Sequence, residues 1–484
     1  MDLTKIYGIA IDESLQGGGE QRIMDAAGLK NDYVVDGNFQ NDGTNDFDNA
    51  YPFGAMRLCN VRIENGCKQV IYEGEPGFSR TGSGGNVMVE IPKFYSRREK
   101  QGSVEKWLIS GACHEGFSIE PCFCRGGKEL DFVYVGVYNS TNCGDGVFSC
   151  TYEFPDIDRT MDDFRKNYAQ YGFDGYDFAI HLALQKLLVI EFGRRDVRQV
   201  LGGIGRMKYF ATILPHNTIE ATAPNCVSIL KDAHRNLNFA PGHEIGFGHI
   251  TKDLTYHRKV TDVKENPHND LWVDVYYDGE DMSGIVAPKK DAIYGIPQRN
   301  GLTDKLNYHT GRVNFCPPLA MEQTPFVSPF RYRNIENVWG NVWEMTAGLK
   351  MHKLNYYYTF EPELYDASIN QWNKFPYPAT EMNELPDLLP DRPHWVAGMG
   401  YDENAPQVLL PIEFASGKMG DHYDGLIYSY YDKDFCGDPM DVETVYTTVT
   451  GGGWDHMYMS LFAYRCFLLE TDTHWLYSNR VCLR

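Results

Sequence analysis

Helical patterns of apolar residues are scarce in this sequence, and that scarcity limits the folds it can adopt. One helix is expected after Thr160, because Thr160 and Asp163 form a capping-box pattern and Gly172 ends the stretch. A second helix is expected from about 176 to 192, and its wide apolar stripe must pack on a sheet or on the first helix. The rest of the 484 residues is therefore expected to form strands and loops.

Strand patterns are most distinct at two places, the segments 86–95 and 132–138. The first 85 residues are rich in Gly, Asn and Asp, so short strands joined by long polar loops are expected there. Polar stretches at about 230–305 and about 350–435 are expected to be insertions rather than separate domains. Aromatic residues reach 14% of the chain, which is typical of a protein that displays a binding surface.

Charge and hydropathy exclude several classes of protein. The net charge of −21 argues against a nucleic-acid-binding protein, because phosphate contacts need a basic face. The most apolar stretch, 182–192, contains Lys186 and Glu191 and is too short to cross a bilayer, so membrane insertion is not expected. Residues 1–14 lack the basic and apolar regions of a secretory signal peptide. The twelve scattered Cys are therefore expected to be thiols made in a reducing cytoplasm.

The most specific segment runs from Tyr332 to Met345. Gly340 and Asn341 predict a tight turn that leads into a buried strand. Trp339 and Trp343, four positions apart, are expected to anchor the core, because Trp is mostly buried in folded proteins.

This segment resembles the Asn-Val-Trp-Glu-Trp element of the C-type-lectin-like fold, in the branch of formylglycine-generating and phage variable proteins. Met345 stands where that family usually has a second Trp. The end of the chain is similar to the closing segments of the same fold, at 451–454, 460–462 and 478–484. Three upstream segments look like phage tail-tip proteins and variable proteins of diversity-generating retroelements: 87–95, 116–121 and 133–138.

The resemblance implies an α+β, C-type-lectin-like fold, with two helices packed on a mixed, mostly antiparallel sheet. It implies a ligand-binding domain over 86–484, with large insertions at about 230–305 and 350–435. Residues 1–85 would form a β-rich segment for attachment and assembly. Four residues would have structural roles: Trp339, Asn341, Trp343 and Trp454.

In such proteins the final stretch displays exchangeable side chains on a fixed backbone. Residues 451–484 hold seven aromatic residues in 34 positions, and small polar groups lie between them. Tyr and Trp give a large contact area at a small cost in rotamer entropy. The expected ligand-binding residues, all predicted to be exposed, are Asp455, His456, Tyr458, Tyr464, Asp472, His474, Trp475 and Tyr477.

The resemblance implies a receptor-binding protein at the tail tip or fibre of a phage or prophage virion, made in the host cytoplasm. Its partners would be a host cell-surface protein or glycan and other virion proteins. Several copies would raise avidity, so an oligomer or an array is expected, with a trimer favoured.

No enzyme activity and no cofactor are assigned from the sequence. Two alternatives stay open, a purely structural virion component and a copper oxidase of the formylglycine-generating type. Cys466 and Cys482 are the candidate copper ligands, because thiolate pairs select Cu(I), but the flanking motifs of that family are missing. The loop motifs of calcium-dependent lectins are also missing. Loop carboxylates could hold a structural calcium ion, and none is assigned.

Overall fold

The computed structural model describes most of the chain. The described residues are 1–31, 34–35, 38–39, 43–197, 200–204, 210–213, 224–233, 239–249, 254–282, 285–286, 290–306, 308–310, 312–315, 327–353, 355–378, 394–416, 421–423, 427–428, 443–453, 460–474 and 476–484.

The protein is built mostly of β-sheet, with 41% of the residues in strands and 13% in helical segments. The strands form many small, mostly antiparallel sheets, and part of this structure makes a half-barrel. The predicted α+β, C-type-lectin-like fold, with two helices packed on one mixed sheet, is therefore wrong. The prediction gave weight to two local helical patterns, whereas short strands separated by polar turns dominate the chain and pair into separate sheets.

Both expected helices are present. Helix α1 (Met161–Ala169) has a capping box, in which the Thr160 side chain accepts from the Asp163 amide and the Asp163 side chain accepts from the Thr160 amide. Helix α2 (Phe178–Phe192) begins at Asp177, whose side chain accepts a hydrogen bond from the Ile180 amide. It ends at Gly193, which has a left-handed φ of 64°. No helix in the described part of the chain is long and apolar enough to cross a membrane.

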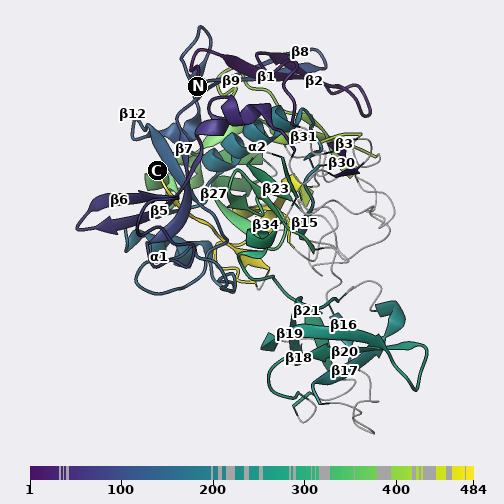
Figure 1. The fold of residues 1–484 in the computed structure, drawn as a ribbon. Helices are drawn as coiled ribbons and strands as arrows, with labels where there is room; N and C mark the ends of the chain where they lie inside the picture. The colour runs from purple at the N-terminus through teal and green to yellow at the C-terminus, as the bar shows by residue number, and fades with distance from the viewer. Residues whose placement is uncertain are drawn as a thin grey trace.

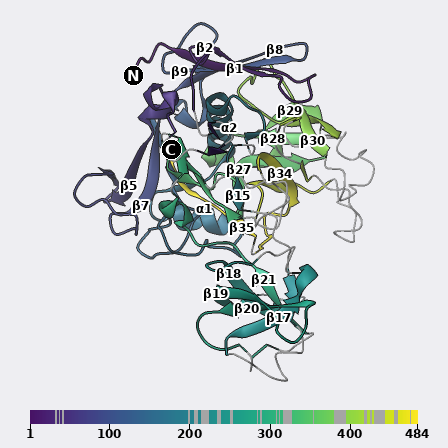
Figure 2. The same ribbon diagram turned by 45° about the vertical axis from the view of Figure 1, so that its right-hand side comes forward.

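Helix α2 lies at the centre of the main body, between the N-terminal and C-terminal sheets (Figures 1 and 2). All of its residues are buried, which explains why its apolar side chains surround the helix instead of forming one stripe. Its buried charges are paired: Lys186 contacts Glu120 at 2.6 Å, and Glu191 contacts Arg333 at 2.7 Å. The helix is thus held on several sides by apolar contacts and ion pairs.

The N-terminal segment shares two of its sheets with later residues. β1 (Ile6–Asp12) pairs with β9 (Val104–Ser110), and β5 (Arg57–Glu64) pairs with β7 (Asn86–Pro92). Residues 1–85 are therefore joined to the expected ligand-binding domain by strand pairing. The strands predicted at 86–95 and 132–138 are present but shorter, as β7 (Asn86–Pro92) and β13 (Phe132–Gly136). One sheet has the order β10 (Ser118–Ile119), β8 (Tyr95–Gln101), β9 (Val104–Ser110), β1 (Ile6–Asp12) and β2 (Glu20–Met24). The other has the order β14 (Asp174–Gly175), β36 (Val481–Leu483), β13 (Phe132–Gly136), β7 (Asn86–Pro92), β5 (Arg57–Glu64) and β6 (Cys67–Tyr72).

The C-terminal half of the main body is built around a larger sheet. Its strands are β29 (Asn373–Pro378), β28 (Asn355–Tyr358), β27 (Trp343–His352), β33 (Tyr446–Gly451), β34 (Ser460–Leu468) and β32 (Ile427–Tyr428), with β35 (Tyr477–Ser478) parallel to β27. A four-stranded sheet contains β22 (Tyr308–Thr310), β23 (Val313–Phe315), β25 (Phe330–Tyr332) and β26 (Ile335–Glu336). The two-stranded pairs are β3 (Val34–Val35) with β4 (Asn38–Phe39), β11 (Cys124–Arg125) with β12 (Lys128–Glu129), β15 (Gly203–Ile204) with β24 (Val327–Ser328), and β30 (His394–Met399) with β31 (Pro411–Ser416).

The insertion expected at about 230–305 is a small lobe with its own sheet, set apart from the main body in both views (Figures 1 and 2). Its first strand begins at Phe210, earlier than the sequence suggested. Inward-facing residues such as Val227, Phe247 and Val275 give the lobe an apolar core. Its strands follow the order β16 (Phe210–Thr212), β21 (Asp291–Gly295), β18 (Glu244–His249), β19 (Leu254–Glu265), β20 (Trp272–Tyr277) and β17 (Cys226–Leu230).

Candidate ligand-binding site

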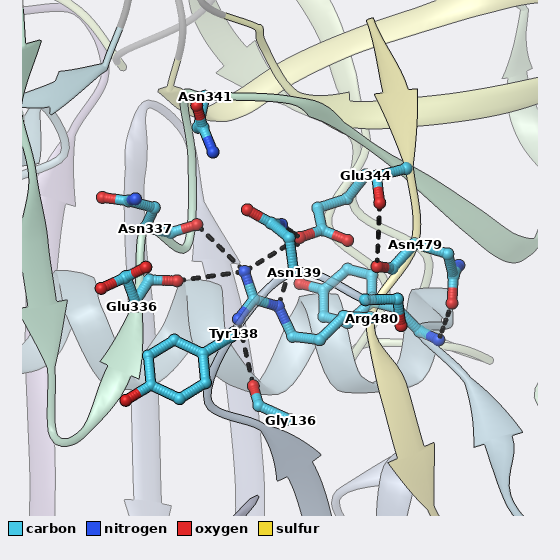
Figure 3. A network of polar contacts seen from close by, with 12 residues as sticks. Gly136, Tyr138, Asn139, Glu336, Asn337, Asn341, Glu344, Asn479 and Arg480 are labelled. Carbon is cyan, nitrogen blue, oxygen red and sulfur yellow. Dashed lines mark hydrogen bonds and ion pairs between the residues drawn. The ribbon is translucent and has the colours of Figure 1, made fainter. Parts of the chain in front are cut away.

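A buried arginine fixes the end of the chain within the main body (Figure 3). The guanidinium of Arg480 contacts the Glu344 carboxylate at 2.9 Å, and Asn139 donates to the same oxygen. Burial raises the pKa of Glu344, while Arg480 acts in the opposite direction. Arg480 also donates to four carbonyl oxygens, those of Gly136, Val137, Glu336 and Asn337. The C-terminal residues thereby hold together segments that lie far apart in the sequence.

The predicted Gly340–Asn341 turn is confirmed. Gly340 and Asn341 have positive φ values of 82° and 65°. The Asn341 side chain also makes two hydrogen bonds to the main chain of Gln298. It accepts from the backbone N–H at 2.6 Å and donates to the backbone carbonyl at 3.0 Å. Trp339 and Trp343 are fully buried, which confirms them as core residues, and Trp339 Nε1 donates to the Gly202 carbonyl at 2.8 Å. The fourth predicted structural residue, Trp454, lies outside the described residues.

Two of the predicted ligand-binding residues are buried, so the expectation that they are exposed is wrong. Tyr464 is fully buried on β34, and its hydroxyl accepts a hydrogen bond from Gln185 of α2 at 2.8 Å. Tyr477 is buried on β35, with its ring centroid 5.2 Å from that of His474. The physical reason is that β34 lies inside the sheet between β33 and β32, and α2 covers Tyr464. The alternating pattern of a strand does not reveal that both faces are covered.

Two further predicted residues, Asp472 and His474, are half-buried in the loop that follows β34. Asp472 accepts from the Leu469 amide at 2.8 Å, and His474 Nδ1 accepts from the Leu476 amide at 3.2 Å. Both side chains therefore bind the backbone at the two ends of the loop 469–474. The remaining predicted residues lie outside the described part of the chain: Asp455, His456, Tyr458 and Trp475.

A cavity of about 410 Å³ opens beside this loop. The start of α1, the middle of β27 and the segment 365–372 form most of its wall. Thr447 of β33 also lines the cavity, as do Glu470 and Thr471 from the loop after β34. The volume lies within the range of roughly 300–1,000 Å³ that is usual for small-ligand sites. The cavity thus joins part of the predicted recognition window to segments that sequence reasoning did not select.

Three ion pairs line the cavity. Lys350 pairs with Glu470, Arg165 pairs with Asp366 at 2.7 Å, and Lys166 pairs with Asp162 at 2.6 Å. In the first two pairs the anion is the exposed partner. The Glu470 and Asp366 side chains are 61% and 76% exposed, whereas those of Lys350 and Arg165 are 11% and 22% exposed. The Arg165 guanidinium lowers the pKa of Asp366, which keeps this carboxylate ionised.

Two aromatic rings contact the cations Lys350 and Arg165. The Lys350 ammonium lies 4.7 Å from the centroid of Trp372, and the Arg165 guanidinium lies 5.1 Å from that of Tyr365. Tyr365 donates from its hydroxyl to Asp177 at 3.0 Å, which ties the cavity wall to the start of α2. Trp372 is 5% exposed, and its indole Nε1 has no acceptor among the described residues. The Tyr365–Asp177 bond therefore fixes this part of the wall, whereas the indole nitrogen of Trp372 is itself buried and is not open to the cavity.

Sequence reasoning missed most of this site. Glu470 and Thr471 fall inside the predicted recognition window, but neither is among the predicted ligand-binding residues. Lys350, Tyr365 and Trp372 come from the aromatic-rich stretch at about 350–435, for which the sequence predicts only an insertion. A contact between an Arg or Lys and an aromatic ring is hard to recognise in a sequence when, as here, the cation and the ring come from different segments.

The candidate copper ligands are both buried. Cys466 lies on β34 and Cys482 on β36, which belong to different sheets. Burial raises the pKa of Cys466 to about 12 and also raises the pKa of Cys482, so the thiolate form that binds Cu(I) is disfavoured. In the described ranges, no group of three or more His, Cys, Asp or Glu side chains is placed to hold a metal ion.

One cysteine pair differs from the expectation of free thiols. Cys143 and Cys150 form a disulfide, so the prediction that all twelve cysteines are thiols is wrong for these two. The two residues flank a Gly-rich turn and are seven positions apart. The spacing of the cysteines in the sequence does not indicate that these two form a pair.

Comparison with known proteins adds no family. A scan against models of protein families and a search of curated proteins both found no match to this chain.

Proposed function

We propose that this protein is a receptor-binding protein of a phage or prophage tail tip, and that it recognises a host surface molecule at the cavity beside loop 469–474. The order of the tail-tip-like segments along the sequence supports this role. One observation carries the proposal. Glu470 and Thr471 belong to the predicted recognition window, are exposed, and line the cavity.

The surroundings of the cavity suit a recognition site. Arg480, which follows the loop and β35, binds Glu344 of β27, and α2 is fully buried. A site on a stiff framework loses little entropy on binding, so a modest contact area can give useful affinity. In this proposal the recognition surface is the loop and the cavity rim, and the buried strands β34 and β35 support them.

The other parts of the proposal concern the virion. The protein would be made in the host cytoplasm, assemble with other tail proteins and act as several copies, with a trimer favoured. Several weak sites on one particle bind a cell surface more tightly than one site does.

The test is binding of the full-length chain to bacterial cells. The labelled protein is titrated onto a panel of candidate host strains, and Thr471→Trp, which fills the cavity mouth, is compared with Thr473→Trp. Both threonines are exposed in the same loop, but only Thr471 lines the cavity. We expect at least tenfold weaker cell binding for Thr471→Trp and wild-type binding for Thr473→Trp.

Two results would reject the proposal. One is a wild-type chain that binds no strain, including the strain that the virion infects. The other is equal cell binding by both variants. If Thr471→Trp changed virion assembly and left adsorption intact, the protein would be a structural component.

A further inference from the structure

Strand β6 lies at the open edge of the six-stranded sheet that contains β7 and β13. It forms a hairpin with β5, and Figure 1 shows this hairpin at the outside of the main body. In the described part of the chain, no strand pairs with the outer side of β6. An unpaired strand edge offers its backbone N–H and C=O groups to another strand, so β6 is a place where a strand can be added.

The turn of the hairpin fixes the direction of the backbone groups of β6. Asn65 and Gly66 have positive φ values of 52° and 75°, as in a two-residue hairpin turn. The flanking residues Glu64 and Cys67 therefore exchange backbone hydrogen bonds, and such pairs recur at every second position. The Glu73 amide also donates to a carbonyl of β5, at 3.0 Å and in the same phase. The odd-numbered residues of β6 thus bind β5, and the even-numbered ones face outward.

Two of the outward-facing residues, Lys68 and Val70, keep their backbone groups open. Tyr72, the third, is already closed, because its amide donates to the Glu75 carboxylate at 2.9 Å and its carbonyl accepts from the Glu75 amide at 3.0 Å. Among the described residues, no hydrogen bond joins the backbone groups of Lys68 or Val70 to a neighbour on the outer side. The edge is therefore open over one short stretch and ends at Tyr72.

The side chains along this stretch do not block a second strand. The Lys68 ammonium is turned over its own sheet, 4.3 Å from the ring centroid of Tyr134 and 3.2 Å from its hydroxyl. Val70 and Ile71 are half-buried, β-branched residues, which favour strand pairing. Lys68 lies near one end of β6, and Glu73 follows the other end. An antiparallel copy of β6 would therefore bring opposite charges together, whereas a parallel copy would bring like charges together.

We propose that two copies of this chain pair through their β6 strands, antiparallel and across a twofold axis. With Lys68 of each copy opposite Val70 of the other, every open backbone group of both edges gains a partner. Gln69 then faces Gln69 of the second copy at the axis. An axis at Lys68 would set two like charges opposite each other, and an axis at Val70 would leave Lys68 facing the closed Tyr72. The open groups therefore select one register.

This contact goes beyond the proposed receptor-binding function. It joins copies in pairs and adds to any threefold contact elsewhere in the assembly. A second copy satisfies both requirements of the edge, the spacing of the open groups and the opposite order of charge.

The first test is cross-linking of the full-length chain in a Cys67→Ser background. Gln69→Cys places a thiol at the axis, where the Cα atoms of opposed residues are about 4.5 Å apart, within the span of a disulfide. Glu64→Cys is the matched control, because Glu64 is exposed on the same hairpin but lies on β5. After mild oxidation, non-reducing gels should show at least about fivefold more linked pairs for Gln69→Cys than for Glu64→Cys.

The second test measures the native mass by light scattering. Val70→Pro removes an outward N–H group and leaves the hydrogen bonds to β5 intact, because the Val70 amide does not face β5. Val70→Ala keeps the N–H group and is the control. We expect Val70→Pro to halve the native mass and Val70→Ala to leave it unchanged. Circular dichroism establishes that each variant is folded, and the cross-linking decides if Val70→Pro is not.

Three results would overturn the proposal. They are equal cross-linking of Gln69→Cys and Glu64→Cys, a native mass that folded Val70→Pro leaves unchanged, and a wild-type chain that is monomeric at micromolar concentration. The last result would leave the edge to a strand of another protein. Neither test uses host cells, so a failure of this contact is distinct from a failure of the receptor-binding function.

Discussion

Replacing Arg480 with Met tests whether the buried network of Figure 3 holds the C-terminal strands in place. Met has a similar reach but donates no hydrogen bond. The Glu344 carboxylate, which is almost fully buried, would keep only Asn139 as a hydrogen-bond donor. The four backbone carbonyl oxygens that Arg480 binds would lose that donor as well.

The expected loss of stability is large. Removing one partner of a buried ion pair costs about 3–5 kcal/mol, because the other charge stays buried without compensation. The matched control is Arg62→Met. Arg62 pairs with Glu64 at 3.4 Å, and both side chains are about half exposed, so its loss should cost no more than about 1 kcal/mol.

The loss should depend on pH in a defined direction. Burial raises the pKa of Glu344 above its ordinary value of 4.5, so the folded protein holds this proton more tightly than the unfolded chain does. The stability that the protonated Glu344 contributes is fully present below pH 4.5. It is lost as the pH rises through the raised pKa of Glu344 in the folded protein. Removing Arg480 raises that pKa further, because Arg480 is the main group that lowers it. The defect of Arg480→Met should therefore be smaller at pH 4.5 than at pH 7.5.

The assay is urea unfolding, followed by tryptophan fluorescence and circular dichroism at both pH values. The double variant Arg480→Met with Glu344→Gln should recover part of the loss at pH 7.5 and show a weaker pH dependence. A loss below about 1 kcal/mol at pH 7.5 would refute the reasoning, as would a loss of the same size at both pH values.

Three further predictions concern the cavity wall, the thiols and the gene. Thr160→Ala removes the cap of α1 and should cost about 1 kcal/mol in the free energy of unfolding, measured by urea titration; unchanged stability would contradict the capping role. Iodoacetamide at pH 8 should alkylate exposed Cys67 in the native protein and Cys466 only after unfolding, as read by mass spectrometry; native alkylation of Cys466 would show that the thiol is accessible. If a retroelement diversifies this gene, a second copy of its 3′ end should lie nearby, and its adenine-linked differences should change codons of loop 469–474 more often than codons of β34. Differences concentrated in β34 would contradict the assignment of β34 as a support strand.

Local features could be predicted because they depend on neighbours in the chain. The Thr160–Asp163 box and Gly193 set the ends of the helices through hydrogen bonds and backbone freedom within a few residues. The Gly340–Asn341 turn likewise needs only residues that tolerate positive φ. The burial of Trp339 follows from the size and apolarity of its side chain.

The sheet architecture could not be predicted in the same way. β13 pairs with β36, although hundreds of residues separate them, and β1 pairs with β9 across the predicted boundary at residue 85. Periodicity shows that a segment is a strand but does not identify its partner. The resemblance at a few motifs was therefore extended into a two-helix α+β fold that the sheets contradict.

The sequence by itself determined the two helices, the strands β7 and β13, the turn at Asn341 and a core that contains Trp339 and Trp343. Only the tertiary structure decided that Tyr464 is buried against Gln185, while Glu470 faces solvent a few residues later. It also brought Lys350, Trp372 and Arg165 from three segments to one cavity. The reason is that backbone conformation and apolar periodicity act over a few residues, whereas exposure and site geometry depend on which distant segments pack together.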